Sequence, residues 1–131
     1  MSNIPSDLRY TKEHGWVRVL AEAVVELGVT EHGQDALGDI VSVELPVIGR
    51  RLAAGEGYVT LESTKTAFEV TSPVAGEVSA VNAELNGAPE LVNQDPYGKG
   101  WLVRLRADRP PVTSAFLDAS AYETLLRSES A

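Results

Sequence analysis

Short stretches of alternating apolar and polar residues recur along most of this 131-residue chain. Alternation with a period of two is typical of a β-strand that turns one face toward a core and the other toward solvent. Turn-forming residues separate the stretches at close intervals, and this spacing predicts a mostly β fold, a small sandwich or flattened barrel. The expected strands are residues 16–19, 23–29, 39–45, 76–81 and 101–107, with one more on each side of Lys65.

The alternation also predicts which side chains are buried. The residues expected to point inward from 39–45 and 101–107 are Val41, Val43, Leu45, Trp101, Val103 and Leu105. Arg104 and Arg106 fall on the opposite, solvent-facing side. The first two strands should form a hairpin whose turn lies near Ala21-Glu22.

Helical signals are few and short. Thr30 is a suitable N-cap for a helical turn that reaches Leu37 and stops at Gly38. Pro89 suits the first position of a second short turn, PELVN. We therefore expect short helical turns between the strands.

A longer helix is expected at the C-terminus, at about residues 118–127. It follows a break at Pro110-Pro111, and its apolar residues recur at helical spacing, which predicts that one face docks on the sheet. These residues are Ala119, Tyr122, Leu125 and Leu126. Because no linker or low-complexity tract interrupts the chain, we expect residues 1–131 to form a single domain.

The overall composition narrows the possible functions. The formal net charge of −8 disfavours nucleic acid and anionic membranes, which require a basic surface, and favours basic protein partners. No stretch is apolar enough to span a membrane, and the N-terminus lacks the features of a targeting signal, so a cytoplasmic location is expected. The sequence contains no cysteine, so any sulfur chemistry must come from a cofactor.

The two histidines offer little sign of a catalytic or metal site. His14 and His32 each follow a glutamate, but neither has an i,i+4 partner. We interpret both as solvated loop residues rather than metal ligands. With two histidines and no cysteine, the chain has few groups for acid–base chemistry near neutral pH, which argues against an enzyme.

One turn presents a lysine in an unusual way. In the stretch VTLESTKTAFEV, alternating apolar residues on both sides predict a hairpin with Lys65 at its tip. The connecting residues, STKT, include none of the Gly, Asn, Asp or Pro that tight turns favour. Glu62 and Glu69 lie on the flanking strands. A rigidly displayed amine suits an enzyme that acylates it, which would remove its charge.

Several separated motifs, in order, resemble those of the glycine cleavage system H protein family. The segment ESTKTAFEVTSPVAGEV is similar to the lipoyl-attachment signature of that family. YTKEHGWVR, LGVTEHGQDALGDIVSVELPVIG and PELVNQDPYGKGWLVRL are similar to other parts of it, so the resemblance runs from about Tyr10 to the C-terminal helix. It implies the flattened barrel-sandwich of lipoyl and biotinyl carriers.

The resemblance implies a non-catalytic carrier. Lipoate would be attached to Lys65, and Glu62, Ser63 and Thr66 would help the attaching enzymes to recognise the turn. The arm would take the aminomethyl group of glycine from a pyridoxal-phosphate glycine decarboxylase to a tetrahydrofolate-dependent aminomethyltransferase. Dihydrolipoyl dehydrogenase would reoxidise it. The carrier is expected to be a monomer, with these three enzymes and the lipoate-attaching enzymes as partners.

Three departures from the family pattern surround this site. Gly15 stands where members usually have Glu, Thr66 where they often have Ala, and Phe68-Glu69 replaces a segment that is typically small and then acidic. Because a protonated aminomethyl group needs a counter-charge in a sheltered cleft, we expect Glu13 or Glu69 to supply it. Glu13 would face the same way as position 15 by strand alternation.

Other interpretations remain open. An H-like lipoyl carrier that serves lipoate relay or another lipoate-dependent pathway shares the motifs. A biotin carrier normally has methionines beside its lysine, whereas Thr64 and Thr66 stand here, and a lipoyl domain of a 2-oxoacid dehydrogenase continues into linkers and a catalytic domain. A small hydrolase is the alternative from another class, without a motif in its favour.

Overall fold

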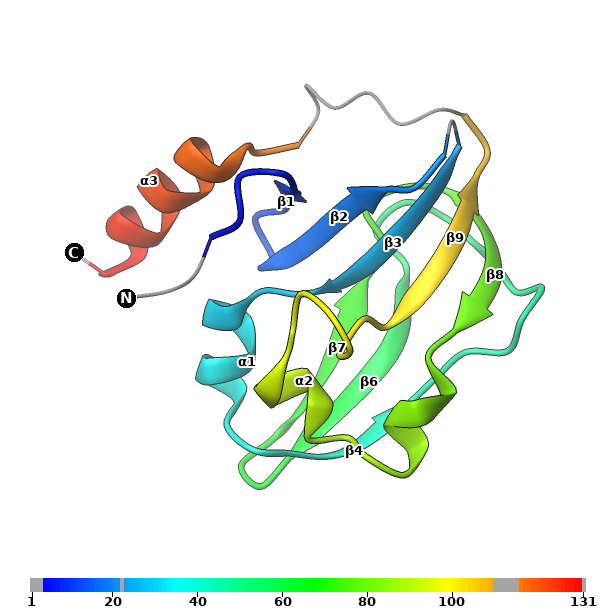
Figure 1. Ribbon diagram of the computed structural model, residues 1–131, viewed down its shortest axis with the longest axis horizontal. Helices are drawn as coiled ribbons and strands as arrows, with labels where there is room; N and C mark the ends of the chain where they lie inside the picture. Colours follow the sequence, from blue (N-terminus) through cyan, green and yellow to red (C-terminus); the bar gives the residue numbers. More distant parts are fainter. Residues whose placement is uncertain (1–3, 22, 110–115, 131) are drawn as a thin grey trace.

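The computed structural model, which describes residues 4–21, 23–109 and 116–130, folds as two antiparallel sheets packed face to face (Figure 1). Among these residues the larger sheet has the order β1-β2-β3-β9-β8-β5, and the smaller one has the order β4-β6-β7. The strands of the larger sheet are β1 (Arg9–Tyr10), β2 (Gly15–Val19), β3 (Val24–Val29), β9 (Val103–Ala107), β8 (Gly76–Val81) and β5 (Arg51–Leu52). Those of the smaller sheet are β4 (Ile40–Glu44), β6 (Gly57–Ser63) and β7 (Ala67–Thr71). The expected flattened sandwich is confirmed.

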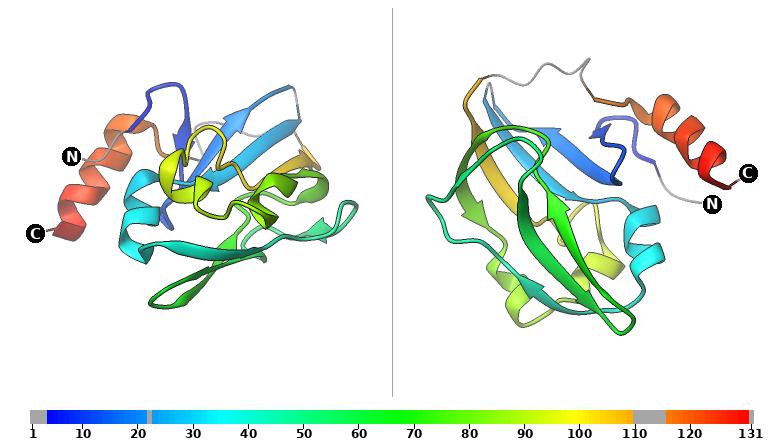
Figure 2. Two further views of the ribbon diagram at one scale, coloured as in Figure 1. Left: turned by 60° about the horizontal axis from the view of Figure 1, so that its bottom comes forward. Right: turned by 180° about the vertical axis from the view of Figure 1, so that it is seen from behind.

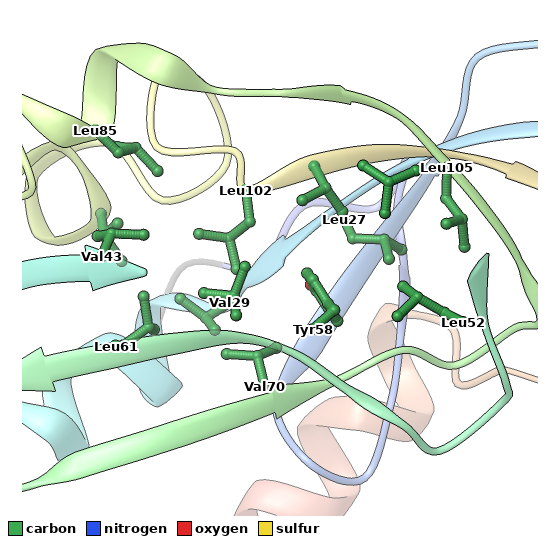
Figure 3. Close-up of a cluster of buried hydrophobic side chains, with 14 of the residues drawn as sticks. Leu27, Val29, Val43, Leu52, Tyr58, Leu61, Val70, Leu85, Leu102 and Leu105 are labelled. Atoms are coloured by element: carbon green, nitrogen blue, oxygen red, sulfur yellow. The ribbon is translucent and has the colours of Figure 1, made fainter. Parts of the chain in front are cut away.

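The main core fills the space between the two sheets (Figure 3). Leu27 and Leu105 project into it from the larger sheet, opposite Tyr58, Leu61 and Val70 from the smaller one. All five side chains are buried. The two-residue strands β1 and β5 were not expected from the sequence, because two residues carry too little alternation to be recognised.

The inward face of β4 differs from the simple alternation that the sequence predicts. Ile40 and Val43 are buried, at 3% and 7% exposed, whereas Val41 is 55% exposed. The pairing of β4 with β6 is irregular between Ile40 and Ser42, consistent with a β-bulge. A bulge adds one residue and reverses the alternation beyond it, so the expectation that Val41 points inward is wrong.

Trp101 also departs from its expected place. It precedes β9 rather than lying within it, and its ring packs beneath the Arg104 guanidinium, 4.6 Å from the ring centroid. The neighbouring Leu102 is wholly buried in the main core instead. Val103 and Leu105 are buried as expected.

Short helical segments connect the strands: α1 (Glu31–Leu37), the 3-10 turn η1 (Ala83–Asn86) and α2 (Leu91–Gln94). The predicted caps of α1 are confirmed. The Thr30 hydroxyl accepts a hydrogen bond from the Gly33 amide at 3.0 Å, and Gly38 ends the helix with φ +87°, a conformation that favours glycine.

The C-terminal helix α3 (Ala119–Ser130) packs against the β1 edge of the larger sheet (Figure 2). It buries Tyr122 and Leu126 in a second apolar cluster, whose other buried members are Leu8, Tyr10 and Trp16. The expected helix and its docking face are confirmed, although α3 extends beyond residue 127 to Ser130.

Glu22 of the expected first turn and the Pro110-Pro111 break lie outside the described residues. Within the part of the chain that the structure describes, no helix has the length and apolarity needed to cross a membrane.

Candidate functional site

Lys65 lies at the tip of the β6–β7 hairpin, which projects from the lower edge of the molecule in the right-hand view of Figure 2. The two strands pair in register up to Glu62 opposite Ala67, and the Ser63 amide then donates a hydrogen bond to the Thr66 carbonyl at 2.8 Å. The turn therefore closes tightly, and it leaves the lysine side chain exposed at the end of a paired ladder.

The Ser63 side chain supplies what the turn sequence lacks. Its hydroxyl oxygen accepts hydrogen bonds from the amides of Lys65, at 3.2 Å, and Thr66, at 3.1 Å. The same hydroxyl is within 3.2 Å of the Thr66 carbonyl and donates to it. A serine hydroxyl can hold a turn in this way without glycine or asparagine. The absence of glycine is thus explained by local side-chain bonding, and Ser63 shapes the backbone that carries Lys65.

A second contact ties the tip of the hairpin to the end of α1. The Thr64 amide donates to the Asp39 carbonyl at 3.1 Å, directly after the helix stops at Gly38. The Lys65 side chain extends over that glycine, where a Cβ would lie 3.4 Å from the lysine Cε. The lysine therefore stands on a turn that is held from two sides.

The carboxylates expected around Lys65 lie on one face of the smaller sheet. Glu62 pairs with Ala67 and Thr60 pairs with Glu69, so all four residues share the outer face, opposite the buried Leu61. Phe68, on the inner face, is 36% exposed, because β7 is an edge strand of the smaller sheet, whereas its partner Leu61 on the central strand β6 is buried. Glu62 therefore lies on the outer face next to the turn that carries Lys65, and Glu69 lies farther from the tip on the same face.

A cleft of about 330 Å³ opens at the other end of this hairpin. It lies between the turn after β1, the end of β7 and the segment that leads into α3. Its lining residues are Tyr10, Thr11, Lys12, Glu13, Gly55, Thr71, Ser72, Pro73, Phe116 and Leu117. Glu13 lines this cleft, whereas Lys65 and Glu69 are not among its lining residues.

Glu69 nevertheless extends toward that end of the hairpin. Its carboxyl group lies against Gly57, where a Cβ would come within 2.1 Å of the glutamate Cδ. Gly57 pairs with Thr71, which is a lining residue of the cleft. The two candidate carboxylates, Glu13 and Glu69, therefore approach the cleft from different elements.

The expectation that strand alternation turns Glu13 to the same side as position 15 is wrong. Residues 11–14 form a turn, not a strand, and β2 begins only at Gly15. His14 has φ +67°, which few residues other than glycine adopt, and the Gly15 amide donates to the Thr11 hydroxyl at 3.0 Å. Glu13 faces the cleft because of this turn and not because of strand alternation.

The two histidines are not solvated loop residues. Their ring centroids lie 4.7 Å apart, and both side chains are half-buried. His14 Nδ1 is 2.8 Å from the Tyr122 hydroxyl, and His14 Nε2 is 3.1 Å from a carboxylate oxygen of Glu129. The Tyr122 hydroxyl is in turn 2.7 Å from the Thr30 hydroxyl. No local pattern indicates this group, because its members come from a turn, the start of α1 and the distant C-terminal helix.

Burial shifts the pKa values of His14 and Tyr122. Desolvation lowers the pKa of His14 below its usual value, against the opposing effect of the Glu129 carboxylate. Desolvation also raises the pKa of Tyr122 to about 12. With His14 neutral, one assignment satisfies every contact: Thr30 donates to Tyr122, Tyr122 donates to His14 Nδ1, and His14 Nε2–H donates to Glu129.

Comparisons with known proteins agree with this architecture. The family model for the glycine cleavage H-protein matches residues 8–129. The glycine cleavage system H protein of Klebsiella pneumoniae subsp. pneumoniae is 48% identical over 129 residues, which cover 98% of this chain and 100% of the relative. That of Laribacter hongkongensis is 53% identical over 123 residues, covering 94% of this chain and 97% of the relative.

A solved structure supports the same conclusion. The crystal structure of a glycine cleavage system H protein from Mycobacterium marinum superimposes with a TM-score of 0.86 at 33% sequence identity. It covers 95% of this chain and 99% of the other. Because the family model and the relatives match nearly the whole chain, this protein belongs to the glycine cleavage H-protein family.

Proposed function

We propose that this chain carries lipoate in amide linkage on Lys65 and works as the lipoyl carrier of the glycine cleavage system. Members of the family are carrier components and not enzymes. The observation that supports the attachment site most strongly is the rigid display of one exposed lysine, on a turn held by the Ser63 hydroxyl and by the Asp39 carbonyl.

The chemistry of the chain fits a covalently held dithiol cofactor. The sequence has no cysteine, so the protein cannot supply redox-active sulfur itself. When attached, lipoate would supply the dithiol that receives the aminomethyl group of glycine, while the protein positions it. Lys65 would contribute the amine that forms the amide, and the hairpin would hold that amine away from the core.

Recognition by the lipoate-attaching enzymes would depend on the shape of the turn. In this proposal Ser63 fixes the backbone, and the exposed Glu62 and Thr66 present side chains on either side of Lys65. A fixed turn lowers the entropic cost of placing the amine in the active site of another enzyme.

The carrier would serve three catalytic partners in turn: glycine decarboxylase, aminomethyltransferase and dihydrolipoyl dehydrogenase. A tether keeps its cargo at high effective concentration wherever the carrier docks. We propose that this cycle takes place in the cytoplasm and that the carrier is a monomer consisting of one domain over residues 1–131.

We propose that Glu13 or Glu69 supplies the counter-charge of the loaded arm. Glu13 lines the cleft near the end of β7, and Glu69 projects from the outer face of β7 itself, so either carboxylate would oppose the positive charge of an aminomethyl group. This arrangement would replace the glutamate that the family usually has at position 15, where this chain has Gly15. Burying the cation without such a partner would be costly.

The attachment site can be tested with the three lysines of the chain. Lys65→Arg should fold normally, because substitutions at exposed positions usually change stability by less than about 0.5 kcal/mol. It should nevertheless lose lipoylation completely when incubated with lipoate ligase, ATP and lipoate, as measured by intact mass and peptide mapping. Lys12→Arg and Lys99→Arg are the matched controls, since both lysines are exposed, and both variants should be modified like the parent. Lipoate on Lys12 or Lys99 in the Lys65→Arg variant would refute the assignment.

An H-like carrier for lipoate relay remains the second candidate, and the absence of glutamate at Gly15 is the observation that favours it. The two functions differ in their response to glycine decarboxylase. A carrier of the glycine system, once lipoylated, should support release of carbon dioxide from carboxyl-labelled glycine by that enzyme. A relay carrier should pass lipoate to other acceptor proteins without supporting this release.

A further inference from the structure

Three side chains that could bind a metal meet where α3 packs against the rest of the molecule. His14 comes from the turn after β1, His32 from the first turn of α1 and Glu129 from the last turn of α3. One ligand atom of each lies within 4.8 Å of the other two. Among the described residues, these three side chains form a group that is close enough to share one ion.

The spacing is near that of a tetrahedral site. Ligand atoms at about 2.0–2.1 Å from one ion stand roughly 3.3 Å apart in tetrahedral geometry. His14 Nε2 and the Glu129 carboxylate oxygen are already 3.1 Å apart. The half-buried His32 ring needs a movement of about 1–2 Å, which is within the reach of side-chain rotation.

The backbone is arranged to bring the two rings together. His14 occupies the left-handed region, with φ +67°. Gly33 follows His32, and a Cβ there would lie only 3.2 Å from His14 Cβ, so glycine permits the close approach of the turn to α1. Non-glycine residues in the left-handed region cluster at functional sites.

The far nitrogen of His14 has the partner that a metal-bound imidazole requires. A histidine that binds metal through Nε2 normally donates its Nδ1–H to an oxygen that fixes the ring. Here Nδ1 lies 2.8 Å from the Tyr122 hydroxyl, which lies 2.7 Å from the Thr30 hydroxyl. If the Nε2 proton is displaced, the direction of these hydrogen bonds can reverse, with Nδ1–H donating to Tyr122 and Tyr122 donating to Thr30.

We propose that His14 Nε2, an imidazole nitrogen of His32 and the Glu129 carboxylate bind one divalent cation of the zinc class, with water in the remaining position. Two imidazoles and one carboxylate suit zinc, whereas magnesium and calcium prefer oxygen ligands alone. The ion would join α3 to α1 and to the turn that carries Glu13, so it would also stiffen one wall of the cleft.

The test uses the full chain without an affinity tag, stripped of metal, in the Lys65→Arg background so that no dithiol can bind the ion. Calorimetric titration with ZnCl₂ should show one equivalent bound, and Co²⁺ should give the intense visible absorption of a tetrahedral site. His32→Gln and Glu129→Gln should each lower the affinity at least about 10-fold. Tyr122→Phe should lower it about 10- to 100-fold, because it removes the hydroxyl that orients His14 without removing a ligand.

Controls distinguish this site from surface binding. Glu123→Gln lies on the same helix, but Glu123 pairs with Arg127, so this variant should bind zinc like the parent. Circular dichroism should show the parental fold in each variant, and Glu129→Gln is the decisive one, since Glu129 is exposed and its loss should leave the core intact. Absence of stoichiometric binding, or affinity that is unchanged in either His32→Gln or Glu129→Gln, would overturn the proposal.

Discussion

At the scale of single residues, Ser63 is the group on which the lysine turn most depends. Its one hydroxyl accepts from two backbone amides and donates to a carbonyl, so the turn keeps its shape although Thr64 and Thr66 are poor turn formers. A glycine at the same point would close the turn at the expense of a more mobile backbone. The serine therefore serves the display of Lys65 as well as the folding of the hairpin.

Ser63→Ala should loosen the tip without unfolding the protein. Loss of these partly exposed hydrogen bonds should cost about 0.5–1.5 kcal/mol, and the amides of Lys65 and Thr66 should exchange with solvent faster. The rate of lipoylation should fall, because the amine is no longer held in one place. Amide exchange measured by NMR and lipoylation followed by mass spectrometry check both effects. Ser63→Thr keeps the hydroxyl and should behave like the parent; equal rates in Ser63→Ala would mean that the backbone alone shapes the turn.

The counter-charge of the loaded arm is also a question of single residues. If Glu13 or Glu69 shelters the aminomethyl group, then Glu13→Gln or Glu69→Gln should shorten the lifetime of the loaded carrier against spontaneous loss. The lifetime is measured after loading with decarboxylase and glycine and then removing the enzyme. Glu84→Gln, an exposed acid on η1, is the control and should have no effect.

Gly15→Glu gives the opposite test of the same idea. A Cβ at position 15 would lie 3.2 Å from the Thr11 hydroxyl, which is tight, so folding must be verified first. If both glutamine variants keep the parental lifetime while Gly15→Glu lengthens it, neither Glu13 nor Glu69 replaces the glutamate of the family.

At the scale of elements, the pairing of β2 with β3 fixes the position of the Trp16 ring. Trp16 pairs with Gly28 across these strands, and its ring covers the glycine. The indole Nε1–H donates to the Pro96 carbonyl at 2.8 Å, and the Arg18 guanidinium lies 5.0 Å from the ring centroid on one face. The ring is therefore fixed by three neighbours and has little room to move.

Gly28→Ala should destabilise the fold by about 1–3 kcal/mol, because a Cβ there would lie 2.4–2.5 Å from atoms of the buried Trp16 ring. Urea unfolding followed by tryptophan fluorescence measures the loss. Gly87→Ala is the matched control, since nothing lies within 4 Å of its Cβ position and its φ is −101°. It should change stability by less than about 1 kcal/mol. Parental stability in Gly28→Ala would show that the Trp16 ring can shift at little cost.

At the scale of the whole molecule, charge is the property that most affects encounters with partners. The chain carries a net charge of −8, and Glu62 and Glu69 share the outer face beside Lys65. Lipoylation removes the lysine charge and makes that face more negative. A partner that docks there should therefore present a basic surface.

Association of the lipoylated carrier with glycine decarboxylase should slow as ionic strength rises toward the physiological value, where the screening length falls to about 8 Å. Stopped-flow measurement of the association rate at several salt concentrations checks this. Glu62→Gln with Glu69→Gln should reduce the salt dependence, whereas Glu123→Gln on α3, away from the hairpin tip in Figure 2, should not. A rate that does not change with salt would indicate that shape and apolar contact guide docking.

Much of the fold follows from local pattern. Alternation predicted the longer strands, and Thr30 and Gly38 marked the ends of α1, because capping and side-chain facing depend on neighbours in the chain. The motif around Lys65 indicated the family for the same reason: the acylated turn is one short, continuous segment. These features were determined by the sequence itself.

Other features were decided by tertiary structure. Whether Val41 points in or out depended on a bulge between paired strands. Leu102 is buried in the main core, whereas Trp101, expected there, packs against the second apolar cluster and the Arg104 guanidinium. The largest difference is the group of His14, His32, Tyr122 and Glu129. Its members lie up to 115 positions apart, from His14 to Glu129. The approach of the turn after β1 to α1 brings the two histidines together, and the docking of α3 on the β1 edge of the sheet adds Tyr122 and Glu129. Local patterns carry no information on such contacts, because packing between distant segments selects them.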